Sequence, residues 1–144
     1  MMDLLPGIRS SASALGAERL RLEIISQNIA NANTTRGLDG QPYQRQMVSF
    51  ESVLDQQSVG RTGPLATSNV RVSSVQNDQR KPRLIYDPTA ADADPTTGLV
   101  AMPDINIQEE MVDMIASTRA YEANLAVVRN ARNMAMQTLA IGKH

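Results

Sequence analysis

The sequence of 144 residues contains no cysteine and no tryptophan, one phenylalanine and a single histidine, the terminal His144. Without cysteine there is no disulfide, thiolate nucleophile or cysteine-based zinc site. One histidine at the end of the chain argues against a Ser-His-Asp triad and a histidine-ligated metal. Aromatic residues make up only 3% of the chain, whereas a compact core of this size usually contains several buried rings. Neither an enzyme nor a bound cofactor is predicted.

Charge and hydropathy exclude further classes. The 14 basic residues are balanced by 15 acidic ones, which removes the usual argument for a nucleic-acid partner. No segment approaches the roughly 20 apolar residues of a membrane span. Asp3 and Pro6 interrupt the first residues, and no basic start precedes a continuous apolar stretch. A cleaved signal peptide is therefore not predicted.

The residues from about Pro6 to Asn33 have the pattern of an amphipathic helix. Pro6 is tolerated there because a proline in the first helical turn removes an N–H that would have no partner. Apolar side chains recur at helical spacing and form one stripe, at Ile8, Leu15, Leu22, Ile25 and Ile29.

A second and longer helix is predicted from about Ile105 to Ile141. Asn106 and Glu109 resemble a capping box at its start. A seam with alternating spacings of three and four residues follows for about four heptads, which is typical of coiled coils. Its members are Met111, Met114, Thr118, Tyr121, Leu125, Val128, Ala135 and Leu139, with an interruption at Arg132.

Two helices of this length are predicted to pair in an antiparallel or crossing arrangement. The pair buries one mutual seam, and other apolar residues lie outside it: Leu20, Ile24, Val112, Ile115, Val127, Met134 and Met136. Such residues indicate further copies or partners. The alternative is a three-layer globule in which the middle of the chain covers them.

The middle segment, residues 36–103, holds six of the seven prolines and shows weaker periodicity. Residues 47–54 are compatible with a strand or a short helix. Residues 70–75 and 83–87 are predicted to form one β-hairpin, followed by a loop over 87–98. The fold class is thus mainly α, with helical units in 1–35 and 104–144 and a small β-containing or extended insert in 36–103.

Two charged clusters in the insert are candidates for binding sites. Asp87, Asp92 and Asp94 lack the glycine and later glutamate that a calcium loop requires, so a solvated turn is preferred. The basic residues of 80–83 have no interleaved aromatics and indicate a charged hairpin tip rather than a phosphate site. No metal site is predicted.

The segment SQNIANANTTRG, residues 26–37, is more specific. Asn28, Asn31 and Asn33 suit a helix end, where amide side chains bond backbone groups locally or across an interface. The segment resembles the signature of the axial proteins of bacterial flagella, the rod, hook and hook-associated proteins. The delayed motif Gly-x-Pro-Tyr-x-Arg at 40–45 is similar to that of the proximal rod members. Residues 83–88, 98–125 and 130–143 agree with the same family.

The resemblance implies a structural subunit of the proximal rod in the periplasmic part of the basal body. Such proteins assemble into a helical tube that transmits torque and surrounds the export channel. The implied partners are further copies, other flagellar rod proteins and the basal-body adaptor at the inner-membrane ring, with delivery by the flagellar type III apparatus. An alternative function is a helical module that binds a partner protein.

Within this expectation, Leu15, Leu22, Ile25 and Ile29 are predicted to pack against Met114, Tyr121, Leu125 and Val128. The three asparagines are predicted to set the geometry where the first helix ends. Subunit packing is assigned to all of these residues together with Ile8, Met111 and Leu139.

Overall fold

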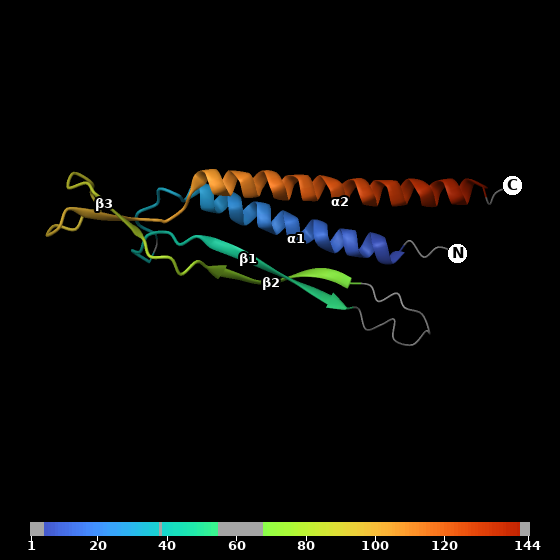
Figure 1. Ribbon diagram of the computed structural model, residues 1–144, viewed down its shortest axis with the longest axis horizontal. Helices are drawn as coiled ribbons and strands as arrows, with labels where there is room; N and C mark the ends of the chain where they lie inside the picture. Colours follow the sequence, from blue (N-terminus) through green and yellow to red (C-terminus); the bar gives the residue numbers. More distant parts are fainter. Residues whose placement is uncertain (1–4, 38, 55–67, 142–144) are drawn as a thin grey trace.

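The computed structural model describes residues 5–37, 39–54 and 68–141. Two long antiparallel helices lie side by side, α1 (Leu5–Ala30) and α2 (Ile107–Ile141), with the start of α1 and the end of α2 toward the same end of the molecule (Figure 1). At 1.5 Å per residue, α2 is about 52 Å long and α1 about 39 Å. The structure confirms the two terminal helices with a β insert between them.

The helix boundaries follow local chemistry. The Oδ1 of Asn106 accepts a hydrogen bond from the N–H of Gln108 at 3.1 Å, so Asn106 caps α2 as predicted. Glu109 contacts the Asn106 side-chain amide at 3.2 Å, and this differs from the backbone contact of a full capping box. Helix α1 ends at Ala30, three residues before the predicted end, because a turn begins at Asn31.

The insert contains two separate two-stranded antiparallel sheets. Strand β1 (Gln46–Leu54) pairs with β2 (Ser68–Asn77), and β3 (Arg83–Tyr86) pairs with β4 (Leu99–Met102). The predicted hairpin between residues 70–75 and 83–87 is therefore wrong. Nine residues of β1 pair with β2, and this long ladder satisfies far more backbone groups than the four-residue β3 offers.

The β1–β2 hairpin covers the side of α1 that faces away from α2 (Figure 1). The guanidinium of Arg21 on α1 lies 5.9 Å from the centre of the Phe50 ring on β1. The N–H of Val70 on β2 donates to the Oγ of Ser13 on α1 at 3.1 Å. Helix α1 is thus the middle of three layers, and its Ile24 and Ile25 are buried.

Helix α2 is covered on one side only. Among the described helices and strands it packs against α1 alone. Small side chains lie at this contact, with Ala17, Ser117 and Ala131 all buried. The hairpin therefore covers the extra apolar residues of α1, as the three-layer alternative predicted, and leaves those of α2 exposed. No helix among the described residues is long and apolar enough to cross a membrane.

Candidate functional site

Three distant segments meet in a polar junction at the end of the helix pair. Asn28 lies in the last turn of α1, Arg45 directly precedes β1, and Glu110 lies in the first turn of α2. Asn28 and Glu110 are each only 1% exposed and, with Ser117, are the largest fully buried side chains of the described chain. Polar groups are buried to this extent at a cost unless they are hydrogen-bonded, so their partners decide what the junction does.

The Asn28 amide forms four hydrogen bonds. Its Nδ2 donates to the carbonyl of Gln46 at 2.9 Å and to Oε2 of Glu110 at 3.0 Å. Its Oδ1 accepts from the N–H of Gln46 at 2.9 Å and from the Tyr43 hydroxyl at 3.0 Å. Both donors and both lone pairs of the amide are used. One side chain of α1 thereby holds the first residue of β1 and the start of α2.

Glu110 completes the junction from the other helix. The Nε of Arg45 donates to Oε1 of Glu110 at 2.6 Å, a charge-assisted bond between groups that are 18% and 1% exposed. The other Arg45 nitrogens lie 3.8 Å from Asp78 and from Asp113. Glu110 is also favoured by its place in the first turn of a helix, where the dipole attracts negative charge.

Tyr43 and Asp78 both lie beside Arg45 of the junction. Burial raises the pKa of the Tyr43 hydroxyl, and the nearby Glu110 charge raises it further. The phenol therefore stays neutral, and its O–H donates a hydrogen bond to Oδ1 of Asn28. The hydrogen bond from Arg80, at 2.7 Å, lowers the pKa of Asp78 against the opposing effect of burial. Arg80 also lies 3.6 Å from Asp104, so the basic cluster 80–83 is partly neutralised within the chain.

Replacing Asp78 by asparagine removes the carboxylate that pairs with Arg80 and Arg45. The free energy of unfolding is expected to fall by only about 1 kcal/mol at pH 7, because these ion pairs are partly solvated. The lowered pKa means that this stabilisation is present above the ordinary value of 3.8 and is lost as the pH falls through the folded-state value. Urea unfolding of both proteins between pH 7 and pH 2 measures the difference. A difference that stays constant over this range would contradict the ion-pair explanation.

The predicted packing residues of α1 occupy different environments. Ile25 and Asn28 are buried, and Asn33 is exposed. The other members are half-buried, namely Ile8, Leu15, Leu22, Ile29 and Asn31. Asn31 acts locally: its Nδ2 donates to the Gln27 carbonyl at 2.9 Å and its Oδ1 accepts from Thr34 at 3.2 Å. The structure thus gives Asn28 and Asn31 defined bonds at the helix end.

On α2 the predicted seam and the observed inner face differ by part of a turn. Met114, Tyr121, Leu125 and Val128 are half-buried, whereas Met111 and Leu139 are 53% and 69% exposed. The most buried positions are Glu110, Ser117 and Ala131. The inner face is therefore lined by small and polar side chains, and part of the apolar seam points outward. The role of these residues in subunit contacts stays a prediction.

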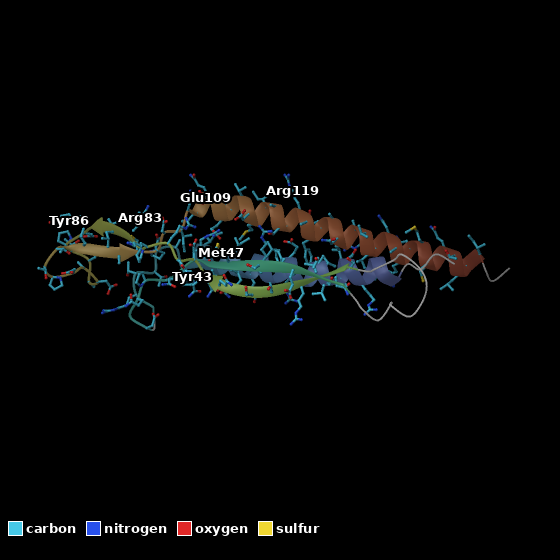
Figure 2. All side chains as sticks on the ribbon, turned by 60° about the horizontal axis from the view of Figure 1, so that its bottom comes forward. Tyr43, Met47, Arg83, Tyr86, Glu109 and Arg119 are labelled. Atoms are coloured by element: carbon cyan, nitrogen blue, oxygen red, sulfur yellow. The ribbon has the colours of Figure 1, made fainter. Side chains whose placement is uncertain are left out.

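The residues of the junction other than Asn28 were not predicted from the sequence. Glu110 is buried, whereas its neighbour Glu109 points outward (Figure 2). A signal was available in the spacing, because Glu110 lies four residues before Met114 and seven before Ser117, on one side of the helix. Tyr43 and Arg45 belong to the Pro-Tyr-x-Arg motif, and the structure gives both side chains partners.

The junction is suited to holding segments together rather than to chemistry. Its groups bond to one another: the Tyr43 hydroxyl donates to Asn28, and the Glu110 carboxylate accepts from Asn28 and Arg45. In the part of the chain that the structure describes, no group of three acidic or histidine side chains has the arrangement of a metal site. In the loop 87–98, Asp87 and Asp94 accept hydrogen bonds from Thr89 and Thr96, as expected for solvated turns.

Comparison with known families agrees with this architecture. Residues 8–36 match the model of the flagella basal body rod protein family, and residues 96–141 match the C-terminal model of the flagellar basal body rod FlgEFG proteins. The two matches cover nearly all of α1 and the whole of α2, and they include Asn28 and Glu110 of the junction. They define the class as flagellar basal-body rod proteins.

Individual relatives narrow the class. The chain is 39% identical to flagellar basal-body rod protein FlgC of Bacillus subtilis, over 99% of this chain and 100% of the relative. It is 40% identical to FlgC of Borreliella burgdorferi, over 97% and 98%, and 35% identical to FlgC of Salmonella typhimurium, over 99% and 100%. The chain belongs to the FlgC family of flagellar basal-body rod proteins. These are structural proteins of the basal-body rod and not enzymes. This confirms the prediction of a structural rod protein and the prediction that the chain is not an enzyme.

Proposed function

We propose that this chain polymerises through its terminal helices into the helical tube of the proximal rod, where it transmits torque and surrounds the export channel. The observation that carries the proposal is the exposed face of α2. Val112, Ile115 and Val127 are 65%, 52% and 51% exposed, and none is covered by the insert. Large apolar side chains left exposed along the open side of a long helix indicate a surface for protein contacts.

The arrangement of layers supports a tube wall. The hairpin shields α1 on the side away from α2, so α2 provides the open helical surface of the molecule (Figure 1). A surface that meets a different surface on the next copy builds a helix that does not close. In this proposal residues 1–35 and 104–144 form the wall, and residues 36–103 lie outside it.

The partners follow from the same proposal. They are further copies, other rod proteins and the adaptor at the inner-membrane ring, in the periplasm. Delivery by the flagellar type III apparatus is compatible with a chain free of cysteine, since such a chain forms no disulfide in an oxidising compartment. A binding module that captures a partner helix remains the alternative outcome of the test below.

The test is a charge on the outer face of α2. Val127→Glu is expected to abolish swimming and to reduce assembled rods at least tenfold, because the carboxylate would be buried without a partner in the wall. The free energy of unfolding of the purified chain should change by less than about 0.5 kcal/mol, since Val127 is exposed in the isolated chain. Charges at the half-buried Leu22 or Leu125 should also block assembly, but they would disturb the fold as well.

The matched control is Gln76→Glu, which adds the same charge at an exposed position of β2. Semi-solid agar motility of a strain that carries each variant as its only copy gives the readout. Normal swimming with Val127→Glu would overturn the assignment of this face to the wall.

A further inference from the structure

One face of the β3–β4 hairpin exposes apolar side chains to solvent. Leu84 and Tyr86 are 62% and 71% exposed, and as alternate residues of β3 they lie on the same face. Their partners across the ladder are Ala101 and Leu99. Val100, on the opposite face, is only 4% exposed. The hairpin thus buries one face within the chain and presents an apolar patch on the other.

This hairpin tip is also acidic. From residue 84 to residue 102 the only charged side chains are Asp87, Asp92 and Asp94. Hydrogen bonds from Thr89 lower the pKa of Asp87, and those from the backbone around Thr96 lower that of Asp94, so both stay ionised at neutral pH. Asp92 accepts hydrogen bonds from Thr35 and Arg36.

The opposite end of the molecule has the complementary character. The last part of α2 exposes Met136, Leu139 and Ile141 by 61%, 69% and 77%. Between residues 123 and 141 the only charged side chains are Arg129 and Arg132, both exposed. This end of α2 is apolar and basic.

The two patches lie at opposite extremes of an elongated molecule. Figure 1 places the β3–β4 hairpin beyond the start of α2 and the end of α2 at the other extreme. In Figure 2 Tyr86 lies close to the tip, away from the helix pair. Two different patches with opposite charge at opposite ends are what a head-to-tail contact between copies requires.

We propose that the Leu84–Tyr86 face of one copy binds the Met136–Ile141 end of α2 in a second copy, with Asp87 and Asp94 facing Arg129 and Arg132. This contact rests on the proposed assembly into a rod and specifies one of its interfaces. It is heterologous, so a pair of copies keeps one free hairpin face and one free helix end, and the contact can repeat along the rod.

The absence of cysteine allows a direct test, because each single substitution introduces the only thiol of the chain. Tyr86→Cys and Leu139→Cys chains are co-expressed in a strain lacking its own copy, and basal bodies are treated with a short bis-maleimide. A covalent dimer containing one chain of each kind is expected at least tenfold above the dimers from either variant alone. Ser73→Cys, exposed on β2, replaces Leu139→Cys in the control. Leu84→Cys with Met136→Cys provides a second pair.

The predicted contact between the aspartates of the hairpin tip and the two arginines of α2 is tested in the same cross-linking assay. Adding Arg129→Glu and Arg132→Glu to the Leu139→Cys chain is expected to reduce the mixed dimer at least fivefold. Mixed dimers absent from both pairs, while the strains swim, would overturn the end-to-end contact and leave the rod assignment intact. Self-dimers as abundant as mixed ones would overturn its head-to-tail nature. Absence of the wild-type chain from basal bodies would instead overturn the proposed function.

Discussion

Replacing Glu110 by alanine is expected to lower the free energy of unfolding by about 3 kcal/mol, a large fraction of the stability of a small protein. The substitution removes the acceptor of the Arg45 Nε, at 2.6 Å, and one of the two acceptors of the Asn28 Nδ2. Arg45 and Asn28 are 18% and 1% exposed, so water replaces the lost bonds poorly. Breaking a buried pair on one side costs more than the pair contributes, because the remaining partner loses its hydrogen bond, and the carboxylates of Asp78 and Asp113 lie 3.8 Å from Arg45, too far to replace it.

Urea unfolding of the full chain, followed by circular dichroism, measures this loss. Glu109→Ala is the matched control, since it removes the neighbouring glutamate of the same first turn at an exposed position. The Glu109→Ala variant should lose less than about 0.5 kcal/mol of its free energy of unfolding. Equal losses for the two variants would show that helix-dipole complementarity, and not the buried junction, is the source of the effect.

Asn28→Asp is expected to be at least as severe, with a loss of about 3 kcal/mol at pH 7. The new carboxylate has no N–H to donate to the Gln46 carbonyl or to Glu110, and it places a like charge where the amide lies 3.0 Å from Oε2 of Glu110. Acidification should reduce the loss, because one proton shared by the two carboxylates removes the repulsion and restores a donor.

The control is Asn33→Asp, an asparagine of the same signature that is exposed. Unfolding curves of both variants at pH 7 and pH 4 separate the explanations. A loss for Asn28→Asp that does not change with pH would argue against charge repulsion. A comparable loss for Asn33→Asp would assign the effect to the helix end as a whole.

The junction and the open face of α2 have complementary roles in the proposed assembly. The junction holds the start of the insert and both helices in one arrangement through bonds within the chain. The outer face of α2 remains available because strands β1 and β2 pack on α1, while Arg45 of the insert contacts α2 at its first turns. Rigidity within the subunit thus coexists with unsatisfied apolar surface between subunits, and a stiff polymer requires both.

Local patterns predicted the helices well. The helical spacing of apolar residues and the Asn106 cap place α2 within two residues of its observed start. The signature at 26–37 predicted the flagellar family, which the relatives confirm. These features are determined by neighbours in sequence, where periodicity, caps and contiguous motifs carry the information.

Pairing between distant segments was harder to predict. The polar stretch of residues 76–82 favoured a hairpin between the strands predicted on either side of it, but β2 pairs with the more distant β1. In the same way, the apolar seam of α2 predicted Met111 and Leu139 at the inner face, whereas Glu110 and Ser117 are buried there. The pairing of β2 and the buried face of α2 both depend on segments that are distant in the sequence: β1 for the strand, and α1 with Arg45 for the helix.

The sequence by itself determined the two long helices, the non-enzymatic character and the family, because each depends on residue types and on spacings along the chain. Only the tertiary structure decided that Glu110 is buried against Asn28 and Arg45, and that β1 and β2 cover α1 while α2 stays open. A buried carboxylate and an exposed one look the same in a sequence. The difference arises when an arginine 65 residues away supplies the hydrogen bond that makes burial possible.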